Sequence, residues 1–64
     1  MKTITIGDFI QITKNVRLYI EDVEIEIENG EITVFFICYE IQEDGSTSQS
    51  RPLLQSQIEE LLKY

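Results

Sequence analysis

The side chains of this chain that could do chemistry are carboxylates. Between Leu18 and Ser50 there are nine of them and no Lys, Arg or His. Six fall within eleven residues: Glu21, Asp22, Glu24, Glu26, Glu28 and Glu31. A pair of carboxylates can act as general acid and base when a pocket sets them in different environments. Here they alternate with apolar residues, which is typical of an exposed strand face, so we expect no such pocket.

Other catalytic and metal-binding patterns are missing from the sequence. There is no His, and the single cysteine, Cys38, has no neighbouring cation that would activate its thiol. The acids beside the Asn29-Gly30 and Asp44-Gly45 turns lack the spacing of an EF-hand loop, and the three glycines are isolated rather than grouped for phosphate binding. We therefore expect no enzymatic activity, no metal site and no cofactor.

Size and charge limit the functions that the chain can have. Its 64 residues suit a single domain over 1–64, and 42% hydrophobic content argues against disorder. The net charge of −7 argues against direct binding to nucleic acid or to an anionic membrane. One cysteine forms no internal disulfide, so oligomerisation is the most accessible further source of stability.

Targeting signals are also missing from the pattern. The segment Met1–Thr5 lacks the apolar core of a signal peptide. No apolar run approaches the ~18 residues of a membrane span. A lone thiol within the apolar run 35–39 suits a reducing compartment as a small buried side chain. The expected location is the cytoplasm.

The clearest structural signal is a β-hairpin around Asn29-Gly30, the dipeptide of a two-residue type I′ turn. This turn predicts the opposed pairs Glu28–Glu31, Ile27–Ile32, Ile25–Val34 and Val23–Phe36. Leu18 and Ile20 have the other parity, so a β-bulge near Glu21-Asp22 is needed to bring them to the same face, with Ile20 opposite Cys38.

The reverse face of this hairpin is also partly apolar. Its predicted members are Thr33, Phe35, Ile37, Tyr39 and Ile41, beside Asp22, Glu24 and Glu26. A strand that is apolar on both faces is normally covered on both. The cover must come from the N-terminal segment, the C-terminal helix or another subunit, and the alternatives are second-layer core or an interface.

The two ends of the chain predict one strand region and one helix. The β-branched stretches 3–6 and 10–13 favour short strands, with a bend or bulge at Gly7-Asp8, followed by a turn at Lys14-Asn15. After the polar loop 43–50, Pro52 keeps Arg51 extended. The stretch 53–64 is predicted to be helical, and Ser56 to Glu59 matches a capping box. Leu54, Ile58, Leu61 and Leu62 form its apolar stripe.

These elements predict an α+β fold: a small antiparallel β-meander of three to four strands with one C-terminal helix packed on it. The alternative is a small, bent, barrel-like sheet, suggested by Gly7-Asp8 and the bulge.

The acidic strand has three interpretations. It can be a solvated face that keeps the protein soluble and blocks edge-to-edge aggregation. It can dock a basic protein. It can also mimic nucleic acid, because residues two apart on a strand lie roughly 6.6–6.8 Å apart, close to the spacing of successive phosphates.

The favoured hypothesis is a non-enzymatic protein-binding module, a small acidic inhibitor or modulator of a basic or nucleic-acid-binding protein. Its candidate partner-binding residues are Asp22, Glu24, Glu26, Glu28, Phe35, Ile37 and Tyr39. In size and composition alone, the chain resembles small inhibitor or accessory proteins of phages and other mobile elements. One alternative is a homo-oligomeric assembly subunit, such as a homodimer, whose acidity serves solubility only. Another is a small-molecule sequestering protein with a pocket between subunits.

Overall fold

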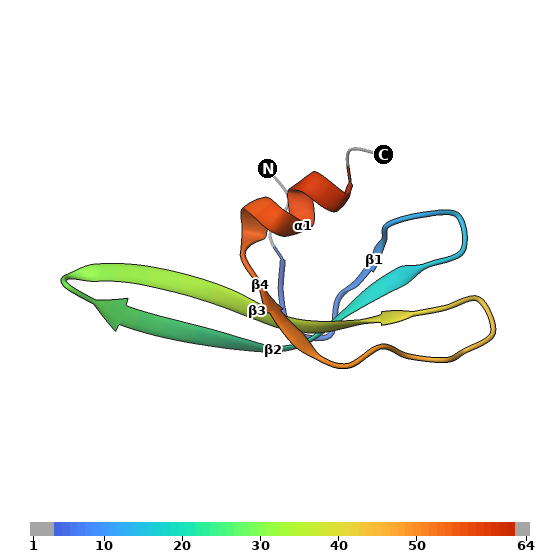
Figure 1. Ribbon diagram of the computed structural model, residues 1–64, viewed down its shortest axis with the longest axis horizontal. Coiled ribbons are helices and arrows are strands. Elements are labelled where there is room, and N and C mark those ends of the chain that lie inside the picture. Colours follow the sequence, from blue (N-terminus) through green and yellow to red (C-terminus); the bar gives the residue numbers. More distant parts are fainter. Residues whose placement is uncertain (1–3, 63–64) are drawn as a thin grey trace.

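The computed structural model describes residues 4–62 as an open antiparallel sheet with one short helix on it (Figure 1). The elements are β1 (Phe9–Gln11), β2 (Arg17–Glu28), β3 (Glu31–Ile41), β4 (Arg51–Leu53) and α1 (Gln55–Leu61). The strand order is β1-β2-β3-β4, so each strand pairs with its neighbours in sequence. This is the α+β meander predicted from the sequence. Within residues 4–62, β1 and β4 form the two edges, so the sheet does not close into the barrel-like alternative.

The β2–β3 hairpin has the register predicted from its turn. The predicted pairs are all present: Glu28–Glu31, Ile27–Ile32, Ile25–Val34, Val23–Phe36 and Ile20–Cys38. Asn29 and Gly30 have φ angles of 53° and 79°, the left-handed geometry that a type I′ turn requires. The register shifts between Ile20 and Asp22, which makes Glu21 the extra residue of the predicted bulge.

The N-terminal strands differ from the prediction. No strand forms over residues 4–6, and Thr3 lies outside the described residues. The Asp8 carboxylate accepts a hydrogen bond from the Thr5 N–H at 2.9 Å, and the Asp8 N–H donates to the Thr5 carbonyl at 3.1 Å. This local turn replaces the extended backbone that β-branched residues favoured. β1 begins one residue before the strand predicted over 10–13 and is shorter.

The helix also begins differently from the prediction, and the Ser56–Glu59 capping box is wrong. The residue at the N-cap is Leu54, and the Gln57 Oε1 accepts a hydrogen bond from the Leu54 N–H at 2.8 Å. The helix predicted over 53–64 starts two residues late because its first residue belongs to β4. Residues 63 and 64 lie outside the described residues.

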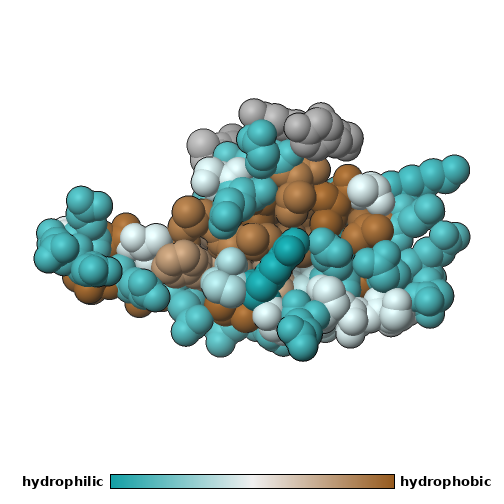
Figure 2. Space-filling model, viewed as in Figure 1, coloured by the Kyte–Doolittle hydropathy of each residue, from teal (hydrophilic) through white to brown (hydrophobic). Residues whose placement is uncertain are grey.

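A small hydrophobic core lies between α1 and one face of the sheet. Its buried members are Ile12, Leu18, Ile20, Phe36, Cys38, Leu53 and Ile58. Of the predicted helix stripe, Ile58 is fully buried and Leu61 packs at the margin of the core, whereas Leu62 is 46% exposed. Figure 2 shows hydrophobic side chains gathered between the helix and the sheet.

β2 and β3 extend well past the rest of the sheet (Figure 1). β1 pairs with residues 17–19 of β2, and β4 pairs with residues 36–38 of β3. Within the described part of the chain, residues 24–35 therefore form a two-stranded ribbon without a third strand, which we call the arm. The arm makes the molecule elongated, with principal extents of 43 × 23 × 15 Å.

Candidate functional site

The face of the sheet turned away from α1 carries the candidate site. Residues directly opposite each other in an antiparallel pair share a face. Asp22 lies opposite Ile37, and Glu24 lies opposite Phe35. The register therefore places all seven candidate residues on this face, which we call the open face: Asp22, Glu24, Glu26, Glu28, Phe35, Ile37 and Tyr39. The helix covers the other face, where Phe36 and Cys38 are buried.

Four exposed carboxylates form the acidic row of the open face. Asp22, Glu24, Glu26 and Glu28 follow one another at alternate positions of β2, roughly 6.6–6.8 Å apart along the strand. None of the four forms an ion pair with another residue in 4–62. The Asp22 Oδ1 accepts a hydrogen bond from the adjacent Val23 N–H at 2.8 Å. The acidic row therefore presents negative charge that no cation of the described chain neutralises by direct contact.

Three aromatic rings continue the open face across the sheet. Phe9, Tyr19 and Tyr39 lie directly opposite one another on β1, β2 and β3. The ring centroids are 4.9 Å apart for Phe9–Tyr19 and 5.3 Å apart for Tyr19–Tyr39, and both pairs are tilted. The Arg17 guanidinium carbon lies 4.9 Å from the centroid of the Phe9 ring, a cation–π contact. We call Phe9, Tyr19 and Tyr39 the aromatic row.

Sequence reasoning found Tyr39 but missed the other two aromatic residues. Phe9 has the opposite parity to its apolar neighbours, which was the available signal that it faces away from the core. Tyr19 has the parity opposite to Leu18 and Ile20, which are both fully buried. Placing both rings beside Tyr39 needs the β1–β2 register, for which the sequence contains no tight-turn signal comparable with Asn29-Gly30.

The open face is thus polar at both ends and apolar in its middle. Arg17 lies at one end, near β1, and the acidic row extends along the arm at the other. Between them, Phe35, Ile37 and Tyr39 are half-buried, and Phe9 is 55% exposed. Aromatic residues and Arg are enriched in protein interfaces, whose apolar centres carry polar rims. This arrangement suits contact with another macromolecule.

The thiol of Cys38 lies behind the open face, within the core. Its Sγ is 3.7 Å from the carbonyl oxygen of Arg51. Burial raises the pKa of the Cys38 thiol, and this effect exceeds the opposing effect of the Arg51 guanidinium. A protonated, buried thiol is a poor nucleophile. Among residues 4–62, no group of three or more His, Cys, Asp or Glu side chains is arranged to hold a metal ion.

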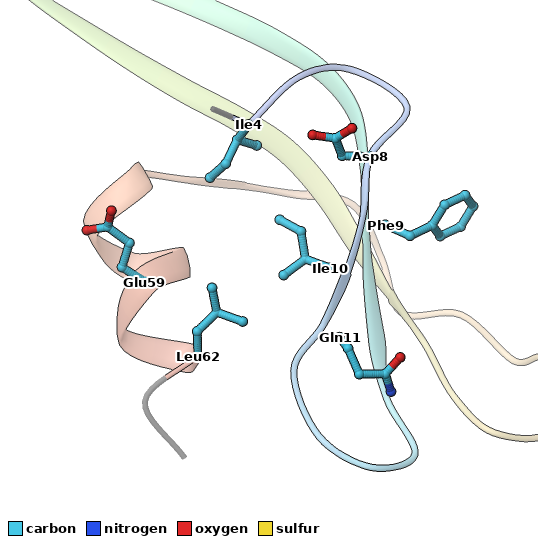
Figure 3. A pocket seen from close by; sticks show the side chains of 7 residues that line it. All are labelled: Ile4, Asp8, Phe9, Ile10, Gln11, Glu59 and Leu62. Atoms are coloured by element: carbon cyan, nitrogen blue, oxygen red, sulfur yellow. The ribbon is translucent and has the colours of Figure 1, made fainter. Parts of the chain in front are cut away.

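A hollow of about 560 Å³ lies between the N-terminal segment, β1 and α1 (Figure 3). The side chains of Ile4, Ile10 and Leu62 point toward it, whereas Phe9 and Gln11 point away. Its carboxylates come from Asp8 and Glu59. The first of these already accepts the Thr5 N–H, and the second accepts a hydrogen bond from Gln55 Nε2 at 3.3 Å. The hollow is therefore mainly aliphatic and offers no nucleophile.

Comparison of the chain with protein-family models, with curated proteins and with solved structures finds no match. Within residues 4–62, the helix is too short to cross a membrane.

Proposed function

We propose that this chain is a non-enzymatic protein-binding module whose open face docks a basic protein. The observation that carries this proposal is the placement of the acidic row and the aromatic row on one sheet face that α1 leaves uncovered. The two rows together provide the two parts of a typical protein interface, an apolar centre and a charged margin.

Charge determines what kind of partner fits this face. The four carboxylates of the acidic row have no cationic partner in residues 4–62, so they are available to Lys and Arg side chains of another protein. The net charge of −7 adds a long-range field that speeds the approach of a basic surface. Tyr39 and Phe35 supply flat apolar surface against which the stems of Lys and Arg can pack.

The spacing of the acidic row favours a nucleic-acid-binding protein as the partner. Carboxylates at alternate strand positions lie roughly 6.6–6.8 Å apart, close to the spacing of phosphates along one strand of a duplex. A site built to bind phosphates would accept Glu24, Glu26 and Glu28 in their place. Docked there, the module would inhibit or modulate the partner by occupying its nucleic-acid site, as expected of a small accessory protein of a phage or mobile element.

Capture from a host lysate tests this function. The wild-type chain is immobilised beside a variant with Glu24, Glu26 and Glu28 changed to Gln. A control variant has Glu43, Glu59 and Glu60 changed to Gln, which removes the same charge from positions off the open face. We expect the wild type and the control to retain a basic protein that salt and duplex DNA release, and the open-face variant to lose it. The same set of proteins on all three surfaces would contradict the proposal.

A further inference from the structure

The arm has a second surface, on the side opposite the open face. It consists of four aliphatic side chains: Ile25, Ile27, Ile32 and Val34. Their exposed fractions are 64%, 73%, 68% and 39%. Ile25 lies opposite Val34, and Ile27 lies opposite Ile32, so the four share the sheet face on which α1 packs. We call this surface the apolar arm face. It continues the core face of the sheet beyond the helix.

We propose that the apolar arm face is the contact between two copies of this chain, whose arms pack face to face. The proposal goes beyond the protein-binding function of the open face and uses the other side of the arm. Either surface can therefore operate without the other.

The distribution of charge favours a second copy as the occupant. A chain of net charge −7 repels its own copies, so a self-contact must keep the carboxylates apart. On the arm, Glu24, Glu26 and Glu28 all lie on the open face. Two arms that meet through their apolar faces stack about 10 Å apart and direct these carboxylates outward, on opposite sides of the pair. Screening over about 8 Å then weakens the remaining repulsion.

The side chains of the apolar arm face also favour a second copy of the chain as the partner. Its four side chains are β-branched aliphatics that need no hydrogen-bond partner, so an identical surface is complementary to it. Two twisted sheets can pack such faces at about −30° to each other. A basic partner would meet no carboxylate here and would have to bury its own charges without compensation. The apolar arm face therefore selects against the partner that the open face attracts.

The apolar arm face has only four side chains in each copy, which predicts a weak dimer. If it is as large as the largest apolar patch on a typical monomer, about 300–600 Å², two copies bury roughly 600–1,200 Å² together. This area is below the standard protein interface of about 1,600 Å². The contact is therefore expected to be reversible rather than obligate, with dissociation on dilution through the micromolar range.

Contact with a second copy would also stabilise the arm. A two-stranded ribbon alone is marginally stable in water. Residues 24–35 have no third strand in the described structure, and α1 does not bury Ile25 or Ile27. A second copy of the chain is present wherever the protein itself is present, whereas the presence of any other partner does not depend on the protein's own concentration.

Sedimentation velocity over a range of concentrations tests the proposal. The wild type should pass from monomer to dimer within the micromolar range, and added salt should leave the dimer unchanged or strengthen it. The variant Ile27→Thr/Ile32→Thr keeps β-branched side chains but should stay monomeric. The matched variant Glu26→Thr/Glu28→Thr, on the other side of the same arm, should still dimerise. A wild type that remains monomeric throughout, or an Ile27→Thr/Ile32→Thr variant that still dimerises, would overturn the proposal.

Methyl NMR on the wild type gives a result that does not depend on how a variant folds. In a sample that mixes labelled and unlabelled chains, we expect contacts between copies at the methyl groups of Ile27 and Ile32. Contacts between copies at the methyl groups of Ile37 instead would place self-association on the open face and overturn the assignment. Loss of partner capture with the dimer intact would contradict the proposed function alone.

Discussion

Gly30 turns the β2–β3 hairpin with a φ of 79°. A Cβ atom at this position would meet nothing within 4 Å, so a larger residue is resisted by the backbone conformation rather than by crowding. We expect Gly30→Val to destabilise the fold by about 1–3 kcal/mol in urea unfolding, because a β-branched residue resists positive φ. Gly30→Asn, which tolerates the left-handed region, should lose much less. Equal unfolding curves for the two variants would show that the turn does not impose this conformation.

Cys38 gives the protein a dependence on alkaline pH. Burial raises the pKa of its thiol above the ordinary value of 9.0. Above that pH the unfolded chain loses the thiol proton while the folded chain keeps it, so the free energy of unfolding should fall as pH rises through this range. Below it, this contribution to stability is fully present.

Chemical unfolding of the wild type and Cys38→Ala on both sides of pH 9.0 measures this effect. The alanine variant is less stable at every pH because it leaves a cavity, but its stability should fall less steeply as pH rises. Parallel pH dependences in the two proteins would contradict the assignment to Cys38. The thiol should also react with alkylating reagents more slowly in the folded protein than after unfolding.

The first turn of α1 is capped by a different side chain from the one that the sequence motif predicts. Gln57 Oε1 accepts the Leu54 N–H, whereas Ser56 lies inside the helix. We expect Gln57→Ala to lower the free energy of unfolding by about 0.5–1.5 kcal/mol and Ser56→Ala to change it by only a few tenths. Thermal or urea unfolding of both variants measures the difference. A larger loss from Ser56→Ala would restore the capping box predicted from the sequence.

The sequence predictions are correct where a local turn motif and the alternating pattern agree, and wrong where a distant contact or an unrecognised local turn overrides the pattern. The β2–β3 hairpin is correct in register because Asn29-Gly30 and the alternating pattern specify it locally. The predicted helix start is wrong because Leu53 of β4 pairs with Phe36 of β3, a contact that no local motif reveals. The strand predicted over 3–6 does not form over residues 4–6, because the Asp8 carboxylate accepts the Thr5 N–H and closes a turn within this β-branched stretch.

The candidate site was partly accessible from the sequence for the same reason. Parity along β2 and β3 places the acidic row and Tyr39 on one face without further information. The aromatic row needed the β1–β2 pairing, which joins Phe9 to Tyr19 across a loop whose predicted turn at Lys14-Asn15 does not specify the register. The alternating pattern predicted the pairing of Ile25 and Ile27 with residues of β3. It could not predict that both side chains are exposed, because this depends on where β4 and α1 end.

For the whole molecule, the two associations proposed for the two faces of the arm should respond to salt in opposite ways. Docking of a basic protein on the open face should weaken as salt rises, because the attraction between opposite charges is screened. Contact between two apolar arm faces should not weaken, because salt screens only the repulsion between copies. A face-to-face dimer would also present two open faces outward, so that an immobilised partner is held with avidity.

Electrostatic steering by the acidic row is what the proposed docking depends on, and steering acts on the association rate. The decisive measurement is the binding kinetics of the purified captured partner at two salt concentrations. The wild type is compared with the Glu24, Glu26 and Glu28 to Gln variant and with the Glu43, Glu59 and Glu60 to Gln control. We expect the open-face variant to associate roughly 10- to 100-fold more slowly at low salt and to lose most of its salt dependence. Equal association rates for the two variants at both salt concentrations would contradict the proposed docking and leave the acidic row as solvated surface.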